Sequence, residues 1–299
     1  MRLAIGAGIL LLLVGMAAPA QQREALREIT AWRAQQDKDM RGEKSPLSVE
    51  SVHVLRRERN TIGRAADADL RLDAPGVPAL AATAVVRGQE CVLEAHSPLV
   101  RVNSHAAHGQ PTGQPLKLTD RVAIGPFRLQ FRRPEGTPAL RVSNLRSAAL
   151  RSYAGLKYYP VELKYRVPAK FTPSPQANRL VVDATQGGPQ QLLLAGKLSF
   201  ELEGKPFQLD AFVDDDQPES LFVIFKDTTN GGETYPVGRY VYVKKPRAGG
   251  DRVDRVVLDF NQAFNPLCAY GPLFFCPIPP RQDHLPVAIP AGEKNYAAP

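Results

Sequence analysis

Apolar and polar positions follow a helical rhythm in residues 22–40. Leu26, Ile29 and Trp32 recur every three positions among charged residues, and neither Gly nor Pro interrupts them. Such spacing gathers apolar side chains on one face of an α-helix. We therefore predict a helix within residues 21–44, with its Trp32 face packed against the rest of the protein.

After residue 44 the pattern changes to short apolar runs that favour β-strands. Arg87-Gly88 separates two such runs, residues 84–86 and 91–93, as the turn of a β-hairpin does. We expect short strands throughout residues 45–136.

Residues 137–299 continue the strand pattern over a longer stretch. Gly204-Lys205 lies between two alternating runs and predicts another hairpin. Residues 221–225 are continuously apolar, which is typical of a buried central strand. Because helical patterns are scarce beyond residue 40, we predict an all-β protein: an N-terminal helix, a first β domain over residues 45–136 and a second, larger one over residues 137–299.

Residues 1–20 have the character of an export signal. Arg2 supplies a positive charge, residues 3–16 are apolar, and the Ala-Pro-Ala at residues 18–20 fits the small-x-small rule for cleavage. The apolar run is too short for a comfortable membrane span, so we expect a cleaved signal peptide and no span after its removal; a retained anchor is the alternative. The localisation that follows is periplasmic or secreted.

The chain is basic, with 38 Lys and Arg against 30 Asp and Glu. These basic residues are scattered rather than clustered, which argues against a nucleic-acid partner. A basic exported protein can stay close to acidic lipid head groups or glycans. The favoured explanation of the charge itself is a merely solvated basic surface, and any partner is expected to be a small molecule or an envelope component of unknown identity.

Polar side chains gather just after the predicted strand at residues 221–225. Asp227 and Glu233 flank a Thr-Thr-Asn-Gly-Gly turn, which can place both carboxylates on one rim for acid–base work or for Ca²⁺. The plainer interpretation is a structural turn capped by Asp227 and Thr228. Arg239 is expected to pair with a carboxylate of this turn through its forked guanidinium. The candidate ligand-binding residues are Asp227, Thr228, Glu233, Tyr235, Arg239, Asn261, Asn265 and Glu293.

Known catalytic motifs are missing from the sequence, which has no Gly-x-Ser-x-Gly turn, no His-Glu-x-x-His helix and no phosphate-binding loop. No second histidine pair accompanies His105 and His108, so we expect neither a metal site nor a cofactor. The leading hypothesis is a non-catalytic binding or structural module of the cell envelope. The alternative is a hydrolase that uses Asp227 and Glu233 in a cleft of the C-terminal domain, so whether the protein is an enzyme stays open.

The three cysteines have different surroundings in the sequence. Cys91 stands in an apolar strand and is expected to be a small buried hydrophobe. Cys268 and Cys276 are close together in a segment whose prolines and glycines prevent regular ladder hydrogen bonds. In an oxidising compartment we expect a Cys268–Cys276 disulfide; two buried free thiols or a metal site are the alternatives.

Several motifs of the C-terminal domain stand out together. They are residues 227–235, 238–240 and 259–261, Asn265-Pro266 with Cys268, Cys276-Pro277 with Pro279-Pro280, and residues 292–294; upstream, Trp32-Arg33 and Ser45-Pro46-Leu47 join them. This set resembles a bacterial family known only as domain of unknown function sixteen eighty-four. The resemblance is expected to cover nearly all of the mature chain, and it implies no activity because the family has none assigned.

The first β domain carries a second resemblance. Ile62-Gly63-Arg64, Val102-Asn103 and residues 118–125 follow the order found in forkhead-associated domains, which are β-sandwiches that bind phosphothreonine. Here Val-Pro-Ala-Leu-Ala at residues 77–81 replaces the Ser-x-x-His segment of that family, and Pro and Ala side chains cannot donate hydrogen bonds to phosphate. The resemblance therefore implies a forkhead-associated-like β-sandwich over residues 45–136 and no phosphopeptide partner.

Overall fold

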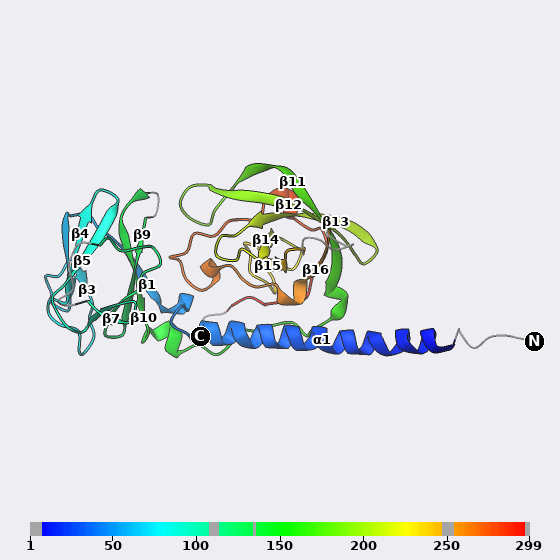
Figure 1. Cartoon of the computed structure of the whole chain (residues 1–299), viewed down its shortest axis with the longest axis horizontal. Helices are drawn as coiled ribbons and strands as arrows, with labels where there is room; N and C mark the ends of the chain where they lie inside the picture. The colour runs from blue at the N-terminus through cyan, green and yellow to red at the C-terminus, as the bar shows by residue number, and fades with distance from the viewer. Residues whose placement is uncertain (1–7, 108–113, 134–135, 247–253, 297–299) are drawn as a thin grey trace, which may run out of the picture. The chain divides into compact units, whose positions relative to one another are not determined.

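The structure, a computed structural model, describes residues 8–107, 114–133, 136–246 and 254–296. The chain forms two units, Asp39–Tyr153 and a second unit made of Met1–Lys38 together with Ala154–Ala298. We call them the sandwich unit and the C-terminal unit; Figure 1 traces the chain through both. The predicted all-β architecture with an N-terminal helix is confirmed.

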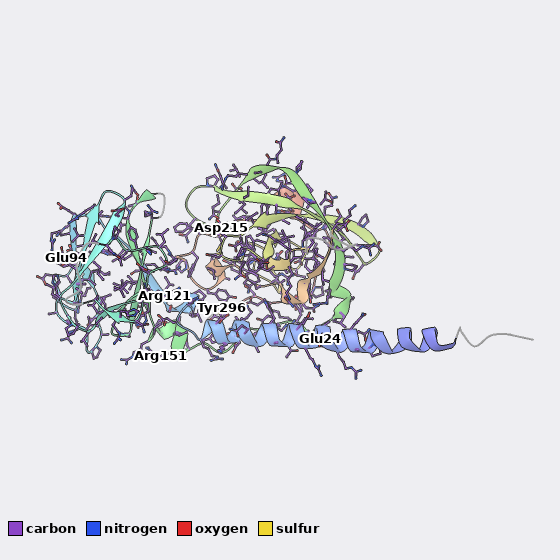
Figure 2. The ribbon with its side chains drawn as sticks, in the orientation of Figure 1. Glu24, Glu94, Arg121, Arg151, Asp215 and Tyr296 are labelled. Atoms are coloured by element: carbon purple, nitrogen blue, oxygen red, sulfur yellow. The ribbon has the colours of Figure 1, made fainter. Side chains whose placement is uncertain are left out.

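Helix α1 (Gly8–Met40) contains the predicted helix and begins earlier than expected. Ala25 and Ile29 are buried, whereas Glu24 lies on the exposed face (Figure 2). Leu26 was expected on the buried face but is 40% exposed. The reason is geometric, because one residue along an α-helix turns the side chain by about 100°, and the buried stripe follows Ala25 and Ile29.

The predicted signal peptide, residues 1–20, falls partly on residues 1–7, which lie outside the described ranges. Within the described ranges, α1 continues without a break from Gly8 past Ala20. None of the helices in the described ranges is long and apolar enough to cross a membrane.

The sandwich unit contains two sheets, with strand orders β1-β10-β9-β8-β6-β7 and β3-β2-β4-β5. The predicted hairpin is β4–β5, joined by antiparallel pairing. The strands are β1 (Val49–Val54), β2 (Arg59–Gly63), β3 (Leu70–Arg71), β4 (Ala82–Arg87), β5 (Glu90–Ala95), β6 (Val100–Val102), β7 (His105–Ala106), β8 (Val122–Ile124), β9 (Phe127–Arg132) and β10 (Ala139–Asn144).

One hydrophobic cluster joins the two sheets of the sandwich unit. Ile62 of β2 contributes from one sheet and Ile124 of β8 from the other, and both are 0% exposed. Two sheets that share one core form a sandwich, so this part of the prediction is confirmed. The finer resemblance to forkhead-associated domains stays a prediction.

The sandwich unit extends beyond the predicted boundary at residue 136. Strand β10 pairs with β1 on one side and with β9 on the other, so it lies inside a sheet of the sandwich unit. Beyond it, the Ser147 hydroxyl caps the short helix α2 (Ala148–Arg151) and donates a hydrogen bond to the Leu47 carbonyl (2.8 Å). Local sequence did not show this, because β10 takes its place through pairing with a strand about 90 residues earlier.

The C-terminal unit is built on one antiparallel sheet with the order β15-β14-β13-β12-β11-β16. Its strands are β11 (Arg166–Val182), β12 (Gln190–Leu202), β13 (Lys205–Val213), β14 (Ser220–Phe225), β15 (Arg239–Lys244) and β16 (Arg255–Asp259). Short 3₁₀ turns occur at Leu163–Tyr165, Phe260–Gln262, Leu267–Ala269 and Arg281–Asp283. Beyond Asp259 the described chain has no further strand, and isolated bridges and side-chain hydrogen bonds hold it.

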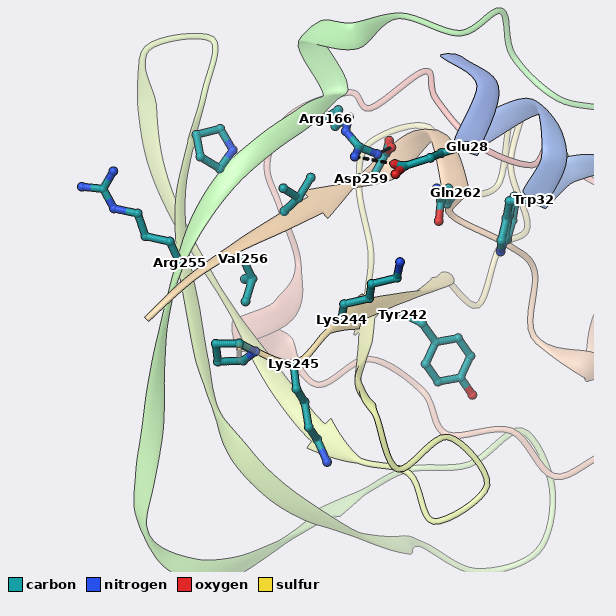
Figure 3. A pocket seen from close by; sticks show the side chains of 13 residues that line it. Glu28, Trp32, Arg166, Tyr242, Lys244, Lys245, Arg255, Val256, Asp259 and Gln262 are labelled. Atoms are coloured by element: carbon teal, nitrogen blue, oxygen red, sulfur yellow. Dashed lines mark hydrogen bonds and ion pairs between the residues drawn. The ribbon is translucent and has the colours of Figure 1, made fainter. Parts of the chain in front are cut away.

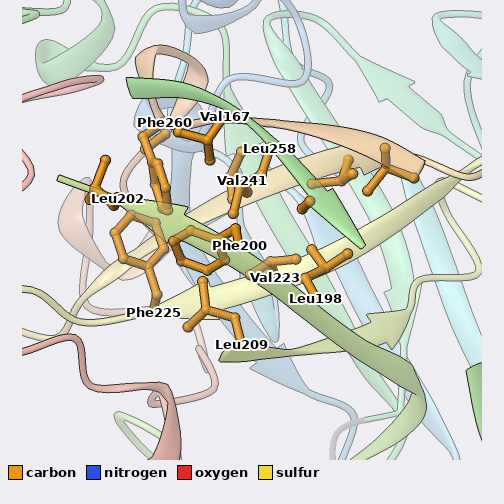
Figure 4. Close-up of a cluster of buried hydrophobic side chains, with 14 of the residues drawn as sticks. Val167, Leu198, Phe200, Leu202, Leu209, Val223, Phe225, Val241, Leu258 and Phe260 are labelled. Atoms are coloured by element: carbon orange, nitrogen blue, oxygen red, sulfur yellow. The ribbon is translucent and has the colours of Figure 1, made fainter. Parts of the chain in front are cut away.

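The predicted hairpin and the predicted buried strand are both present in this sheet. β12 pairs with β13 across a tight turn in which Glu203 and Gly204 have φ values of +52° and +76°, the left-handed region that glycine adopts without strain. β14 lies between β13 and β15. Figure 4 shows Val223 and Phe225 of β14 among the apolar side chains of the core.

The two ends of this sheet approach each other. β15 and β16 are its terminal strands, and they lie close together although no ladder of hydrogen bonds joins them among the described residues. The sheet is therefore curled toward a barrel that a seam leaves open. Such a seam exposes strand edges and side chains that a closed barrel would cover.

Candidate functional site

Arg239 contacts the turn that follows β14, as predicted. Its Nη2 lies 2.6 Å from Asp227 Oδ2, and both side chains are 0% exposed. Arg239 also donates to the carbonyls of Ile289 (2.9 Å) and Ala291. The second Asp227 oxygen accepts hydrogen bonds from the Thr229 amide (2.8 Å) and hydroxyl (2.6 Å). Both carboxylate oxygens are thus occupied inside the protein, where a ligand has no access.

Glu233 lies at the surface instead, with 61% of its side chain exposed. It accepts a hydrogen bond from the Tyr159 hydroxyl (2.5 Å), and Lys294 Nζ is 3.4 Å from its other oxygen. The Tyr159 hydrogen bond and the Lys294 charge lower the pKa of Glu233. The turn therefore directs Asp227 inward and Glu233 outward, which corrects the expectation that both carboxylates share one open rim.

Glu293, Asn265 and Asn261 are buried as well. The Glu293 carboxylate accepts hydrogen bonds from the Asn265 amide (3.0 Å), the Asn265 side chain (2.9 Å) and the Tyr270 hydroxyl (2.6 Å). Burial raises the pKa of Glu293 to about 7. Asn261 donates to the Glu162 carbonyl and to Asp259, each at 3.0 Å. These side chains fix irregular backbone in place of a strand ladder.

The remaining two predicted residues border the same network. Thr228 is exposed, and its amide donates to the Val287 carbonyl (3.1 Å). Tyr235 is half-buried, and its hydroxyl donates to the Cys268 carbonyl (3.1 Å). The predicted set is therefore mainly an internal scaffold, with Thr228 and Glu233 as its exposed members.

The predicted disulfide is not formed in the structure, where Cys91, Cys268 and Cys276 are free. Cys268 and Cys276 are instead joined through a hydrogen bond from the Cys268 amide to Cys276 Sγ (3.2 Å). Cys91 is 0% exposed, in agreement with its predicted place in the core. No group of three or more His, Cys, Asp or Glu within the described ranges could hold a metal ion, and His108 lies outside those ranges.

A pocket opens in the C-terminal unit at the seam between β15 and β16, with a volume of about 760 Å³. Side chains of α1, β11, β15 and β16 surround it (Figure 3). Its lining consists of Glu28, Trp32, Arg166, Pro168, Tyr242, Lys244, Lys245, Pro246, Arg255, Val256, Val257, Asp259 and Gln262.

Arg166 pairs with both acidic side chains of the pocket and offsets one of their two negative charges. Its guanidinium donates to Asp259 Oδ2 and to Glu28 Oε2, each at 2.7 Å (Figure 3). Because Glu28 belongs to α1, Asp259 ends β16 and Arg166 begins β11, this triad ties the helix to the seam. The guanidinium bridges the two carboxylates with one charge-assisted hydrogen bond to each, and such bonds are stronger than those between neutral groups.

The other basic side chains leave positive charge in the pocket. Figure 3 shows Lys244 extending from β15 into the seam, while Lys245 and Arg255 extend outward. Lys245 donates to the Pro218 carbonyl (2.5 Å). Among the described residues no carboxylate pairs with Lys244 or Arg255. A concave site with surplus positive charge attracts anions.

Two aromatic rings give the pocket flat walls. Tyr242 is stacked on Phe264 with ring centroids 5.6 Å apart, and its hydroxyl donates to Asp214 (2.5 Å). Trp32 of α1 contacts Tyr158 and Phe264, with centroids 6.2 and 6.4 Å apart. Because neighbouring side chains hold both rings, the walls are formed before any ligand arrives.

The sequence-based reasoning missed this pocket. Its residues come from three separate parts of the chain, α1, the start of β11 and residues 242–262, and none of them was among the candidates. The sequence feature that could have indicated the pocket was the position of Lys244-Lys245 at the end of one strand and of Arg255 at the beginning of the next. Without the curl of the sheet, nothing indicates that these two strand ends face each other.

Comparisons with known proteins find a family match for the C-terminal unit. Residues 151–294 match the family described as "Protein of unknown function (DUF1684)". The solution NMR structure of an uncharacterized protein from Haloarcula marismortui shares 36% sequence identity with the chain; the match covers 48% of this chain and 78% of that chain, with a TM-score of 0.40. The chain belongs to the DUF1684 family.

The DUF1684 match confirms the predicted resemblance over a shorter range than expected. Trp32-Arg33 and Ser45-Pro46-Leu47 lie outside residues 151–294, as does most of the sandwich unit. The pocket residues of β11, β15 and β16 lie inside the family segment, whereas Glu28 and Trp32 of α1 lie outside it. No curated protein is similar to the chain at a significant level.

Proposed function

We propose that the C-terminal unit is a non-catalytic binding module of the cell envelope that holds a small anionic molecule in the seam pocket. The supporting observation is the positive charge of Lys244, which extends into the seam of a pocket that the rings of Trp32 and Tyr242 also line. The pocket volume of about 760 Å³ suits a ligand of one or two rings.

The proposed ligand is an acidic sugar, with a carboxylate or a phosphate on the ring. Its negative group would pair with Lys244, which provides three donors. An apolar ring face would lie against Trp32 or Tyr242, because aromatic side chains offer flat apolar area with little loss of conformational freedom. This chemistry limits the partner expected from the sequence, a small molecule or an envelope component, to acidic sugars.

The alternative, hydrolysis by Asp227 and Glu233, has weaker support. A carboxylate that acts as base or nucleophile must come within hydrogen-bond reach of the substrate. The Asp227 side chain is 0% exposed and is engaged by Arg239. Its geometry suits a structural role, so we favour binding over hydrolysis.

Export of the protein is part of the proposal. Cleavage after Ala20 would leave Glu28 and Trp32 on the mature helix, so the pocket would stay complete. N-terminal sequencing of the protein from a periplasmic extract should begin at Gln21. Recovery of the intact Met1 end from the membrane fraction would contradict the cleavage.

Calorimetric titration of the purified full chain tests the binding. Glucuronic acid and glucose 1-phosphate should bind, and neutral glucose should bind at least tenfold more weakly, which corresponds to about 1.4 kcal/mol for one charged contact. Lys244→Gln should weaken binding of both acids by about tenfold. Added salt should weaken the wild-type complex more than the Lys244→Gln complex.

The matched control is Lys205→Gln, which removes an exposed lysine at the start of β13, outside the pocket lining. It should bind both acids as the wild type does. Equal affinity for glucose and for the two acids, or an equal loss in both lysine variants, would show that the pocket does not select anions. Absence of binding by all three sugars would reject the acidic-sugar proposal.

A further inference from the structure

Cys268 and Cys276 form a reduced pair at the surface of the C-terminal unit, and nothing in the proposed binding function uses it. Cys268 lies in the 3₁₀ turn Leu267–Ala269 and is half-buried, whereas Cys276 is only 4% exposed. The Cys268 amide donates to Cys276 Sγ at 3.2 Å. The first side chain is thus partly accessible to solvent, and the second is buried beside it.

The surroundings of the two sulfurs differ in the way that separates an attacking thiol from a resolving one. A hydrogen bond from the Cys276 thiol, aided by Tyr235 and Thr185, outweighs burial and lowers the pKa of Cys268 to about 6. The same hydrogen bond, together with burial, raises the pKa of Cys276. The lowered pKa favours the thiolate, the nucleophilic form of cysteine, at the partly accessible Cys268 rather than at Cys276.

The backbone around the pair is held from outside the loop. The Cys276 amide donates to Thr185 Oγ1 (3.2 Å), and the Thr185 amide donates to the Cys276 carbonyl (3.0 Å). Ala184 forms a bridge with Pro277. These contacts place Cys276 against the segment between β11 and β12, so its sulfur is positioned independently of the Cys268 turn.

Apolar side chains flank both cysteines on the outside. Leu267 precedes Cys268 and is 47% exposed, and Phe275 precedes Cys276 and is 49% exposed. Exposed apolar groups next to a reactive centre are typical of a surface that receives a partner. Here they would receive the apolar side chains of a polypeptide rather than a charged small molecule.

From this arrangement we propose that Cys268 and Cys276 are a thiol–disulfide exchange site, in which Cys268 attacks a disulfide of a partner polypeptide and Cys276 resolves the intermediate. The Cys268 thiolate bonds to one sulfur of the partner disulfide, and the other sulfur leaves as a thiolate. Cys276 then gives up its proton to the thiolate that left in the first step and attacks Cys268 Sγ, which releases the first partner sulfur as a thiolate. The partner disulfide is reduced, and a Cys268–Cys276 disulfide is the oxidised product.

This mechanism explains why the pair is free yet adjacent. An attacking thiol works best when its pKa is close to the ambient pH, because it is then ionised and still strongly nucleophilic. Cys91 provides an internal reference, since burial raises its pKa to about 11 and its side chain is 0% exposed. The bridge expected from the sequence becomes one state of a cycle rather than a permanent staple.

The first test uses the reduced full chain with glutathione disulfide as the probe, followed by intact-mass analysis and peptide mapping. The wild type should lose two hydrogen masses and retain no glutathione. Cys276→Ser should accumulate one glutathione on Cys268, because no thiol resolves it. Cys268→Ser should react at least tenfold more slowly, and Cys91→Ser should behave as the wild type does.

A second measurement needs no variant. The rate of iodoacetamide alkylation at Cys268 of the wild type should rise with pH to a midpoint near 6, while Cys91 stays unmodified below pH 8 or so. A disulfide peptide with leucines beside its cysteines should oxidise the pair faster than glutathione disulfide does. Leu267→Gln should remove that advantage.

Three results would overturn the proposal. A Cys268–Cys276 bridge that mild dithiothreitol does not reduce would be a structural disulfide. Equal alkylation of all three cysteines would show that Cys268 is not activated. Cys276→Ser protein that takes up no glutathione at Cys268 would show that the exposed sulfur does not attack disulfides.

Discussion

The two units bury different kinds of polar side chain among their described residues. In the sandwich unit the buried polar residues are all neutral: Ser45, Ser48, Asn60, Thr83, Ser97, Gln130, Ser143 and Ser147. The C-terminal unit also buries charged groups: Asp210, Asp227, Arg239, Asp259, Asp283 and Glu293. The difference follows the backbone. Two sheets satisfy most backbone groups of the sandwich, whereas residues 260–296 form no strand and need other hydrogen-bond partners.

The buried charges supply these partners. Arg239 donates to carbonyls in the 289–291 segment, Glu293 accepts from the Asn265 amide, and Asp283 accepts from the Asp210 amide (2.8 Å). Charged groups form stronger hydrogen bonds than neutral ones, but a buried charge left alone destabilises the fold. The C-terminal unit should therefore respond sharply to the loss of one charge, and the sandwich unit should not.

The largest expected effect comes from Arg239→Met. The change leaves Asp227 buried without its cation, which should lower the free energy of unfolding of the C-terminal unit by about 3–5 kcal/mol. Hydrogen exchange followed by mass spectrometry on the full chain measures each unit separately. Protection should fall across β14 and β15 and stay unchanged in the sandwich unit.

Arg239→Lys separates charge from geometry. Lysine keeps the positive charge but cannot donate simultaneously to Asp227 and to two carbonyls through a rigid fork. It should destabilise the C-terminal unit less than methionine does, yet measurably. If both variants are as stable as the wild type, the buried pair does not hold this unit together.

The second effect is a pH dependence that the two units should show with opposite signs. Burial, aided by the nearby Asp210 charge, raises the pKa of Asp283 to about 7 from its ordinary 3.8, although the Asp210 amide hydrogen bond and the Lys197 charge lower it. The folded state then holds a proton that the unfolded chain has lost. The stabilising contribution of this proton is complete below pH 4 and disappears as pH rises to about 7. The free energy of unfolding of the C-terminal unit should therefore fall by up to about 4 kcal/mol over this pH range.

Asp283→Asn should flatten that slope, although Glu293, whose pKa is also raised to about 7, contributes in the same direction. The control is Asp254→Asn, a change at a largely exposed carboxylate of the same unit. Urea unfolding at pH 4.5 and pH 7.5 gives both slopes. In the sandwich unit, the Thr61 hydrogen bonds lower the pKa of Asp69 below its ordinary 3.8, so the stability of that unit should fall only on acidification below about pH 4, which a further urea titration at pH 3 measures. A C-terminal unit that is more stable at pH 7.5 than at pH 4.5 would refute the assignment.

The smallest effect is expected at the exposed counterpart of the Arg239 pair. Arg59 forms a bidentate pair with Glu94 in the sandwich unit, at 3.1 and 2.5 Å, and its side chain is 56% exposed. Water and salt screen such a pair. Arg59→Met should leave hydrogen exchange of the sandwich unit within experimental error, and a loss comparable to that of Arg239→Met would show that burial is not the deciding factor.

The sequence predicted those parts of the fold that depend on local pattern. The helix, the β4–β5 and β12–β13 hairpins and the buried strand β14 each follow from spacing over fewer than about 20 residues. The pairing of Arg239 with Asp227 was also predictable. Arg239 begins the strand that follows the turn and lies opposite Phe225, two residues before Asp227. The inner position of β10 depends on pairing with distant β1, and local pattern does not encode it.

The candidate site shows the same limit. Asp227, Asn261 and Glu293 stand out in the sequence because charged and amide residues cluster there, but such residues serve buried backbone as well as ligands. Only the burial of their side chains decides between these roles. Arg166 and Lys244 attract no attention in the sequence, since each is an ordinary basic residue at the end of a strand until the sheet curls.

Helix α1 is synthesised long before the surface on which it rests. Arg33 donates to the carbonyl of Asn261, 228 residues later in the chain, with the whole sandwich unit between them. At a translation rate of roughly 5–20 residues per second, the helix waits more than about ten seconds for this partner. The sandwich unit, whose first strand pairs with its last, can fold during that delay. The order of synthesis thus leaves the N-terminal segment accessible to any export machinery for a period. This period ends when the C-terminal unit folds and α1 packs against it.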